Sequence, residues 1–166
     1  ALIFAALIFD ILDGRIAPQD GRAELGFLFA DLRGFTAMSE KNPPEQVLAL
    51  LNRYFAAITP ALHRHGGTID NFRGDGVMVM FGAPEPLERP AAAAVQAARS
   101  VFEAVDRLNA EFEREGKGRL ALGIGVAYGA AVYGDLGSDD RKDYTALGDA
   151  VIVAARLQDL AKELGY

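Results

Sequence analysis

One short stretch, residues 27–36, constrains the fold more than any other part of the sequence. It reads Phe-Leu-Phe-Ala-Asp-Leu-Arg-Gly-Phe-Thr, an apolar run that ends on the carboxylate of Asp31 and is followed by a turn at Gly34. The run is typical of a buried strand. A carboxylate at the end of such a strand is costly unless a cation pairs with it. Because no basic residue lies at a suitable offset from Asp31, we expect a divalent cation to pair with it.

The residues that follow Asp31 suit phosphate oxygens. Gly34, Phe35 and Thr36 lead into a predicted helix, and backbone N–H groups at a helix N-terminus bind anions. A metal-binding carboxylate next to such N–H groups indicates a nucleoside triphosphate site. From this stretch alone an alternative stays open, in which Asp31 is a turn former or a helix N-cap.

Composition narrows the class of protein. The chain has 166 residues, 51% of them hydrophobic, which fits one domain with its own core. Its formal net charge of −6, without any Lys/Arg-rich run, argues against nucleic acid and anionic membranes as partners. The chain has no cysteine, so disulfides, thiolate catalysis and Cys-based zinc sites are excluded.

Residues 1–23 are predicted to form a linker. A short apolar helix is expected over residues 2–11, followed by a polar loop through Pro18 and Gly21. The helix is too short to cross a bilayer. It is either a packing helix or the end of a signalling helix from an upstream regulatory domain. We expect a cytoplasmic fragment of a longer protein, truncated at the C-terminus, or the cytoplasmic part of a membrane-anchored one.

Hydrophobic periodicity predicts a β-α-β-β-α-β order with added strands and a final helix. Strands are predicted over residues 25–30, 68–72, 77–81, 120–128, 130–136 and 144–145. Helices are predicted from about residue 44 to residue 65, over 91–115, and after Asp149 as the N-cap. This is an α+β fold with a ferredoxin-like core, in which helices flank an antiparallel sheet.

The topology brings a second carboxylate to Asp31. Asp75-Gly76 between two strands is a strong hairpin signal. In a ferredoxin-like sheet the strand after this hairpin pairs with the first strand, so Asp75 is expected beside Asp31. Two adjacent carboxylates repel each other in the absence of a cation, which makes the pair a better metal site than either residue alone.

Three segments resemble the class III adenylate/guanylate cyclase catalytic domain of bacterial type: Phe29–Thr36, Phe72–Gly76 and Tyr144–Val151. They occur in the order and spacing of that family, and the resemblance covers roughly residues 24–165, nearly the whole chain. It implies an enzyme that converts ATP, or alternatively GTP, to the 3′,5′-cyclic nucleotide and pyrophosphate. The ribose 3′-hydroxyl would attack the α-phosphate with the assistance of two metal ions.

The resemblance also implies a role for individual residues near the first carboxylate. Asp31, Asp75 and the backbone carbonyl of Leu32 would bind two Mg²⁺ or Mn²⁺ ions. Asn71 and Thr145 fall on the positions that select the base. Adenylate cyclases of the family usually carry lysine at the first of these positions and guanylate cyclases glutamate, whereas an amide can both donate and accept.

The final helix carries the positions that the resemblance assigns to the transition state. Arg156 matches the family's arginine, but Ile152 stands where the family has an asparagine that orients the ribose or the reacting phosphate. The family's chain also continues past this helix into strands bearing a lysine that contacts the triphosphate. These departures support an alternative function, a weakly active or inactive homology domain that binds nucleotide or mediates dimerisation.

A homodimer with shared sites is the expected assembly. Asn71 lies four strand residues before Asp75, about 13 Å away. A purine base and a phosphate-bound metal are both reached if one chain supplies Asp31 and Asp75 while a partner supplies the base-selecting residues and Arg156. The resemblance implies the same head-to-tail arrangement.

Overall fold

The computed structural model describes residues 20–138 and 141–165, and the helix predicted over residues 2–11 lies outside them. The strands are β1 (Gly21–Leu32), β2 (Gly67–Arg73), β3 (Gly76–Phe81), β4 (Leu122–Ser138) and β5 (Arg141–Leu147). The helices are α2 (Phe35–Lys41), α3 (Pro44–Arg64), α4 (Pro90–Arg114) and α5 (Asp149–Leu164). None of the helices in these two ranges combines the length and apolarity that a membrane crossing requires.

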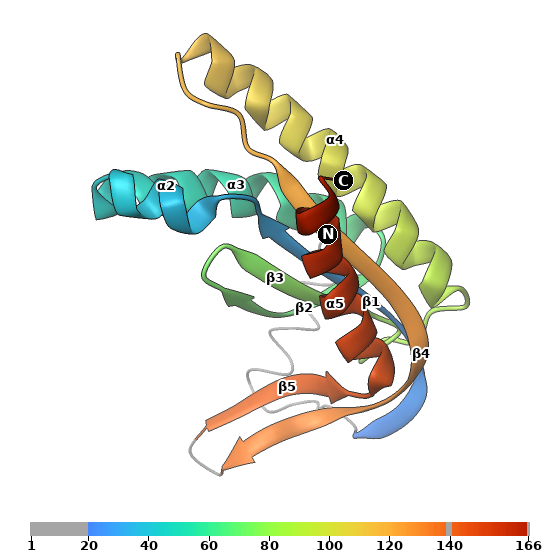
Figure 1. Cartoon of the computed structure of the whole chain (residues 1–166). Coiled ribbons are helices and arrows are strands. Elements are labelled where there is room, and N and C mark those ends of the chain that lie inside the picture. The colour runs from blue at the N-terminus through green and yellow to red at the C-terminus, as the bar shows by residue number, and fades with distance from the viewer. Residues whose placement is uncertain (1–19, 139–140, 166) are drawn as a thin grey trace.

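The strands form one five-stranded antiparallel sheet in the order β2-β3-β1-β4-β5 (Figure 1). The first four strands in this order are the ferredoxin-like core, and β5 is added at the free edge of β4. The predicted α+β fold is therefore confirmed. Strand β3 pairs with β1 as expected, with Ala30 opposite Val77.

Three predictions about strand length were wrong. The short strand expected at residues 144–145 is β5, which extends from Arg141 to Leu147. The strands expected over residues 120–128 and 130–136 are a single strand, β4, because Gly129 continues the ladder opposite Leu25 of β1. Strand β1 begins at Gly21 rather than Leu25, so Gly21 is not in a loop. The apolar pattern underestimates β1 because its first residues extend past the core, where Arg22 and Glu24 are exposed.

The sheet has helices on both faces. Alternate side chains of β1 point to opposite sides, so Leu28 and Ala30 pack in the core that contains α3 and α4. Phe27 and Phe29 face the other core, to which α5 contributes Ala150 and Ala154 as it crosses β4 and β1 (Figure 1). Asp31 continues the row of Phe27 and Phe29, which places it on the α5 side.

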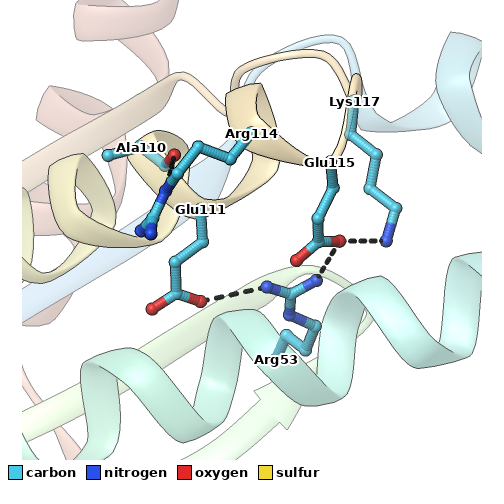
Figure 2. A network of polar contacts seen from close by, with 6 residues as sticks. All are labelled: Arg53, Ala110, Glu111, Arg114, Glu115 and Lys117. Atoms are coloured by element: carbon cyan, nitrogen blue, oxygen red, sulfur yellow. Dashed lines mark hydrogen bonds and ion pairs between the residues drawn. The ribbon is translucent and has the colours of Figure 1, made fainter.

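An ion-pair network joins α3 to the C-terminal end of α4 (Figure 2). The Arg53 guanidinium donates to Glu111 at 3.0 Å and to Glu115 at 2.8 Å, and Lys117 contacts Glu115 at 2.6 Å. The same guanidinium lies 4.4 Å from the ring centre of Phe112. These side chains are partly or largely exposed, so each ion pair contributes little to stability.

Helix α5 lies against β4 at glycines. A Cβ at Gly125 would lie 2.1 Å from the Ala154 carbonyl oxygen, and a Cβ at Gly129 would lie 3.2 Å from the Ala150 Cβ. Gly125 belongs to a Gly-Ile-Gly segment that resembles the start of a dinucleotide-binding fingerprint, but it sits inside a strand and serves helix packing. Residues on the sheet side of α5 consequently lie very close to β4.

The start of α5 differs from the prediction. Asp149 is the first helical residue, and Gly148 occupies the N-cap position without any side-chain capping hydrogen bond. Asp149 still places a negative charge in the first turn, where it interacts favourably with the helix dipole.

Candidate functional site

The structure confirms that the two carboxylates converge at one end of the sheet. The backbone N–H of Leu32 donates to Asp75 Oδ2 at 3.1 Å, which fixes the Asp75 carboxylate at the end of β1 beside Asp31. Burial, followed by hydrogen bonding to Asp31 and its charge, raises the pKa of Asp75 to about 7. The raised pKa therefore reflects first the burial of this carboxyl and then the carboxylate of Asp31 beside it.

Asp31 has a basic partner that the sequence reasoning missed. Lys162 of α5 forms an ion pair with Asp31 Oδ2, so the expectation that no basic residue could pair with Asp31 was wrong. The two residues are 131 positions apart in the sequence, so a search for basic residues near Asp31 along the chain could not find this contact. A signal was present, because Ala154, Gln158 and Lys162 follow one another at i, i+4 spacing on the sheet side of α5.

Two polar atoms near the carboxylates are buried without a hydrogen-bond partner among the described residues, Asp31 Oδ1 and the Tyr54 hydroxyl. Burial, reinforced by the charges of Asp31 and Asp75, raises the pKa of Tyr54. The phenol therefore stays protonated and can donate. The helical spacing of apolar residues predicted that Tyr54 lies in the core, and this is confirmed. The spacing did not indicate that Tyr54 also lies close enough to Asp31 and Asp75 to be affected by their charges.

The arrangement fits a hard divalent cation. Mg²⁺ is usually bound by one or two carboxylates, with waters and substrate phosphates as its other ligands. Within residues 20–138 and 141–165, no group of three or more His, Cys, Asp or Glu side chains is placed to bind a metal. The Asp31–Asp75 pair, with one orphaned carboxylate oxygen, is thus suited to a cation that the substrate helps to bind.

The predicted turn after Asp31 is present. Gly34 has φ +67° and accepts a hydrogen bond on its carbonyl from the Met38 N–H at 3.0 Å. The left-handed conformation favours glycine at this position. Helix α2 begins at Phe35 and has seven residues. The phosphate-binding role of Gly34, Phe35 and Thr36 remains a prediction.

The two base-selecting positions come together although they lie on opposite edges of the sheet. Asn71 Nδ2 donates to Asp70 Oδ2 at 3.2 Å, and Asn71 Oδ1 accepts from Arg73 Nε at 3.2 Å. Because Asp70 only accepts and Arg73 only donates, the Asn71 amide has one orientation. Burial raises the pKa of Asp70, an effect that contact with the Thr145 hydroxyl and the charge of Arg73 oppose.

Asp70 was missed by the sequence reasoning. It lies at a register shift between Ile69 and Asn71 in the β2–β3 ladder, and its Oδ1 is buried without a hydrogen-bond partner in the described ranges. A bulge turns a strand residue out of its expected direction. That irregularity cannot be read from apolar alternation.

Arg156 and Ile152 are not brought to the carboxylates of their own chain. Both lie on the exposed side of α5, and Ile152 is 52% exposed. Within the part of the chain that the structure describes, Arg156 forms no ion pair. Lys162, not Arg156, is the α5 residue that faces Asp31.

A cavity of about 540 Å³ lies elsewhere, between α3 and the segment after α4. Its lining includes Leu50, Phe112, Arg53 and Lys117, and none of the predicted site residues. The last two of these side chains are paired with glutamates at the C-terminal end of α4 and just after it. The cavity is therefore a weaker candidate than the sheet end.

Comparison with known proteins finds one family model that matches most of the chain. The family model described as the adenylate and guanylate cyclase catalytic domain matches residues 18–164. Adenylate cyclase 1 of Rhizobium meliloti is 37% identical over 144 residues, covering 87% of this chain and 22% of that protein. An uncharacterized protein of Mycobacterium tuberculosis is 42% identical over 150 residues, covering 89% of this chain and 26% of that protein. The chain thus spans about a quarter of these curated relatives.

Solved structures of cyclases share the fold. The crystal structure of the guanylyl cyclase Cya2 is 36% identical with a TM-score of 0.80, covering 87% of this chain and 73% of that one. The adenylyl cyclase CyaB from P. aeruginosa is 34% identical with a TM-score of 0.80, covering 86% and 74%. The extent of the family match and the agreement in fold lead to one conclusion: this chain belongs to the adenylate and guanylate cyclase catalytic domain family, as a class III nucleotide cyclase domain.

Proposed function

We propose that this domain converts ATP, with GTP as the alternative substrate, to the 3′,5′-cyclic nucleotide and pyrophosphate. The observation that carries the proposal is the pair of converging carboxylates, Asp31 and Asp75, in a chain of this family. Similar proteins are named both as adenylate and as guanylyl cyclases, so either purine nucleotide is compatible with the comparisons.

The carboxylates would bind two Mg²⁺ or Mn²⁺ ions together with the Leu32 carbonyl. When bound, such ions neutralise triphosphate charge and lower the pKa of the ribose 3′-hydroxyl. The N–H groups of Gly34, Phe35 and Thr36 would bind phosphate oxygens beside them. The Tyr54 hydroxyl stays protonated, feels the charge of both carboxylates and has no hydrogen-bond partner among the described residues, so it would be available to donate a hydrogen bond within the occupied site.

Arg156 is proposed to stabilise the negative charge that develops on the α-phosphate. Its guanidinium is permanently charged and exposed. Lys162 is six positions further along α5, which corresponds to a rise of about 9 Å and places the two side chains on different sides of the helix. A chain whose Lys162 contacts Asp31 therefore presents its Arg156 away from its own carboxylates. This supports a homodimer in which Arg156 of the partner subunit completes each site.

Base selection is proposed to involve Asn71, Thr145 and the neighbouring Asp70. Asn71 uses one of its two Nδ2–H groups to donate to Asp70 Oδ2, so the other remains available to donate to a base. The neighbouring Asp70 Oδ1 is buried without a partner among the described residues and can accept a hydrogen bond. A donor beside an acceptor matches N1 and the amino group of adenine, and equally O6 and N1 of guanine. The pair therefore fits either purine and does not separate ATP from GTP.

A second candidate function is supported by Ile152. An exposed isoleucine at the position of a substrate-orienting asparagine favours a domain that binds nucleotide or mediates dimerisation with slow or absent turnover. The hydrocarbon side chain of Ile152 offers the ribose no hydrogen bond.

One assay separates the two candidates. The purified domain is incubated with ATP or GTP and with Mn²⁺ or Mg²⁺, and cyclic nucleotide and pyrophosphate are measured together. We expect slow release of both products in equal amounts, abolished in Asp75→Asn. Tight binding of Mn²⁺-ATP without either product would favour the binding module instead.

A further inference from the structure

The last turn of α5 is joined to the end of β1 by two contacts. The Lys162 ammonium pairs with Asp31 Oδ2, and Arg33 Nη2 donates to the Ala161 carbonyl oxygen at 2.9 Å. The side chains of Lys162 and Asp31 are 29% and 25% exposed, so the pair is more shielded from water than an ordinary surface ion pair. A positive charge of the chain itself thus occupies a proposed metal ligand.

A glycine of β4 makes room for the Lys162 side chain to pass over the sheet. Gly123 of β4 lies opposite Asp31 in the ladder. A Cβ at Gly123 would lie 2.8 Å from Lys162 Cγ and 3.1 Å from the Gln158 carbonyl oxygen. The Lys162 stem therefore crosses β4 where the sheet has no side chain, and any larger residue at position 123 would displace it.

An ammonium and a divalent cation compete for this carboxylate. Both are positive, and at contact distance from one oxygen they repel each other strongly in a partly buried site. The other Asp31 oxygen is buried and unpartnered among the described residues, and Asp75 adds a second negative charge nearby. A divalent cation held by Asp31 and Asp75 would interact with more negative charge than the single ammonium does.

We propose that Lys162 is the resident counter-ion of Asp31, which it neutralises in the metal-free protein and releases when a divalent cation binds. The inference rests on the proposed function only in assigning a cation to Asp31 and Asp75. Lys162 is a positioning residue here, because it acts on a metal ligand rather than on substrate. It sets the apparent metal affinity and couples metal binding to the end of α5.

Amine labelling tests the displacement directly. The chain has four lysines, Lys41, Lys117, Lys142 and Lys162, so each is resolved by peptide mass spectrometry. Lys41 lies in α2, is exposed and provides an internal reference. Without nucleotide, saturating Mn²⁺ should raise the labelling rate of Lys162 several-fold relative to Lys41. Asp31→Asn should raise it without Mn²⁺. An unchanged or lower rate at saturating Mn²⁺ would overturn the proposal.

Calorimetric titration with Mn²⁺ alone supplies the second readout. If Lys162 occupies Asp31 in nine of ten molecules, Lys162→Met should bind Mn²⁺ about tenfold more tightly. Lys117→Met removes the same charge at the end of α4 and should leave the affinity unchanged. Equal or weaker Mn²⁺ binding by Lys162→Met contradicts the proposal, and the labelling of the unmodified protein decides the matter if that variant does not fold.

The outcomes also separate this inference from the proposed function. Mn²⁺ binding that leaves Lys162 labelling unchanged overturns the counter-ion role alone and leaves the cyclase proposal intact. Failure of both the unmodified protein and Lys162→Met to bind Mn²⁺ overturns the metal site and the inference together.

Discussion

The carboxylate end of the sheet and the outer side of α5 differ in how their functional groups are satisfied. Asp31 and Asp75 are half-buried and have partners in their own chain, the Lys162 ammonium and the Leu32 N–H. Arg156 and Ile152 are exposed, and Arg156 has no ion pair within the described residues. One half of the proposed site is therefore assembled within the chain, whereas the other half is displayed outward.

The difference follows from the cost of burying charge. Half-buried carboxylates require compensation inside the chain, because an unpaired buried charge is strongly destabilising. An exposed arginine requires none. Around Arg156 the exposed side of α5 is apolar, and contiguous exposed apolar surface marks interaction sites. Its apolar members are Ile152, Val153, Leu157, Leu160 and Leu164. A second copy of the chain is the partner that the proposed shared site requires.

The largest expected effect is a loss of metal-dependent nucleotide binding when a carboxylate at the sheet end is removed. Asp31→Asn or Asp75→Asn should weaken Mn²⁺-dependent ATP binding by about 100-fold or more, because each variant removes a proposed metal ligand. Calorimetric titration with Mn²⁺-ATP measures the loss, and thermal melting checks the fold. Asp106→Asn, at an exposed carboxylate of α4, is the matched control. Unchanged affinity for Mn²⁺-ATP in both site variants would contradict the proposed metal site.

The next largest expected effect is a higher turnover rate when an amide is introduced on the exposed side of α5. Ile152→Asn should raise kcat by up to about 10²-fold with little change in KM, because the added amide contacts the transition state more strongly than the substrate. Ile152 is 52% exposed, so the change should alter the stability of the fold by less than about 0.5 kcal/mol. Val153→Asn, at the neighbouring exposed position, is the control. Equal kinetics in both variants would show that position 152 is not a vacant catalytic position.

The smallest expected effect is the contribution of Asp75 to the pH dependence of the free energy of unfolding. Its pKa of about 7, against an ordinary 3.8, means that the folded metal-free protein binds a proton that the unfolded chain releases. The associated stability is complete below about pH 4 and is lost as pH rises to about 7. Urea unfolding with a chelator should show a loss of about 1–2 kcal/mol relative to Asp75→Asn, after allowance for solvent screening. Parallel pH curves for both proteins would contradict this.

Sequence reasoning located the carboxylates because local signals determine them. The Asp75-Gly76 hairpin and the strand order force strand β3 beside β1, so the convergence with Asp31 follows from topology. The Lys162 contact did not follow, because it depends on how closely α5 approaches β4 at Gly123. A contact of that kind requires the helix orientation in three dimensions.

The base-selecting end shows the same limit. The sequence placed Asn71 on a strand and Thr145 on another, which is correct. It did not show that the outer strands β2 and β5 approach each other, nor that the bulge at Asp70 lets one carboxylate contact both residues. Irregularities of register and sheet curvature leave no periodic signal in a single sequence.

Complementation in trans tests the shared site most directly. Asp31→Asn and Arg156→Ala are each expected to be inactive, but in a mixed dimer one of the two sites retains both residues. Mixing equal amounts should restore about a quarter of the wild-type cyclase activity, because half of the dimers are mixed and each has one intact site. No recovery under conditions in which mixed dimers are demonstrated would contradict a site shared between two chains.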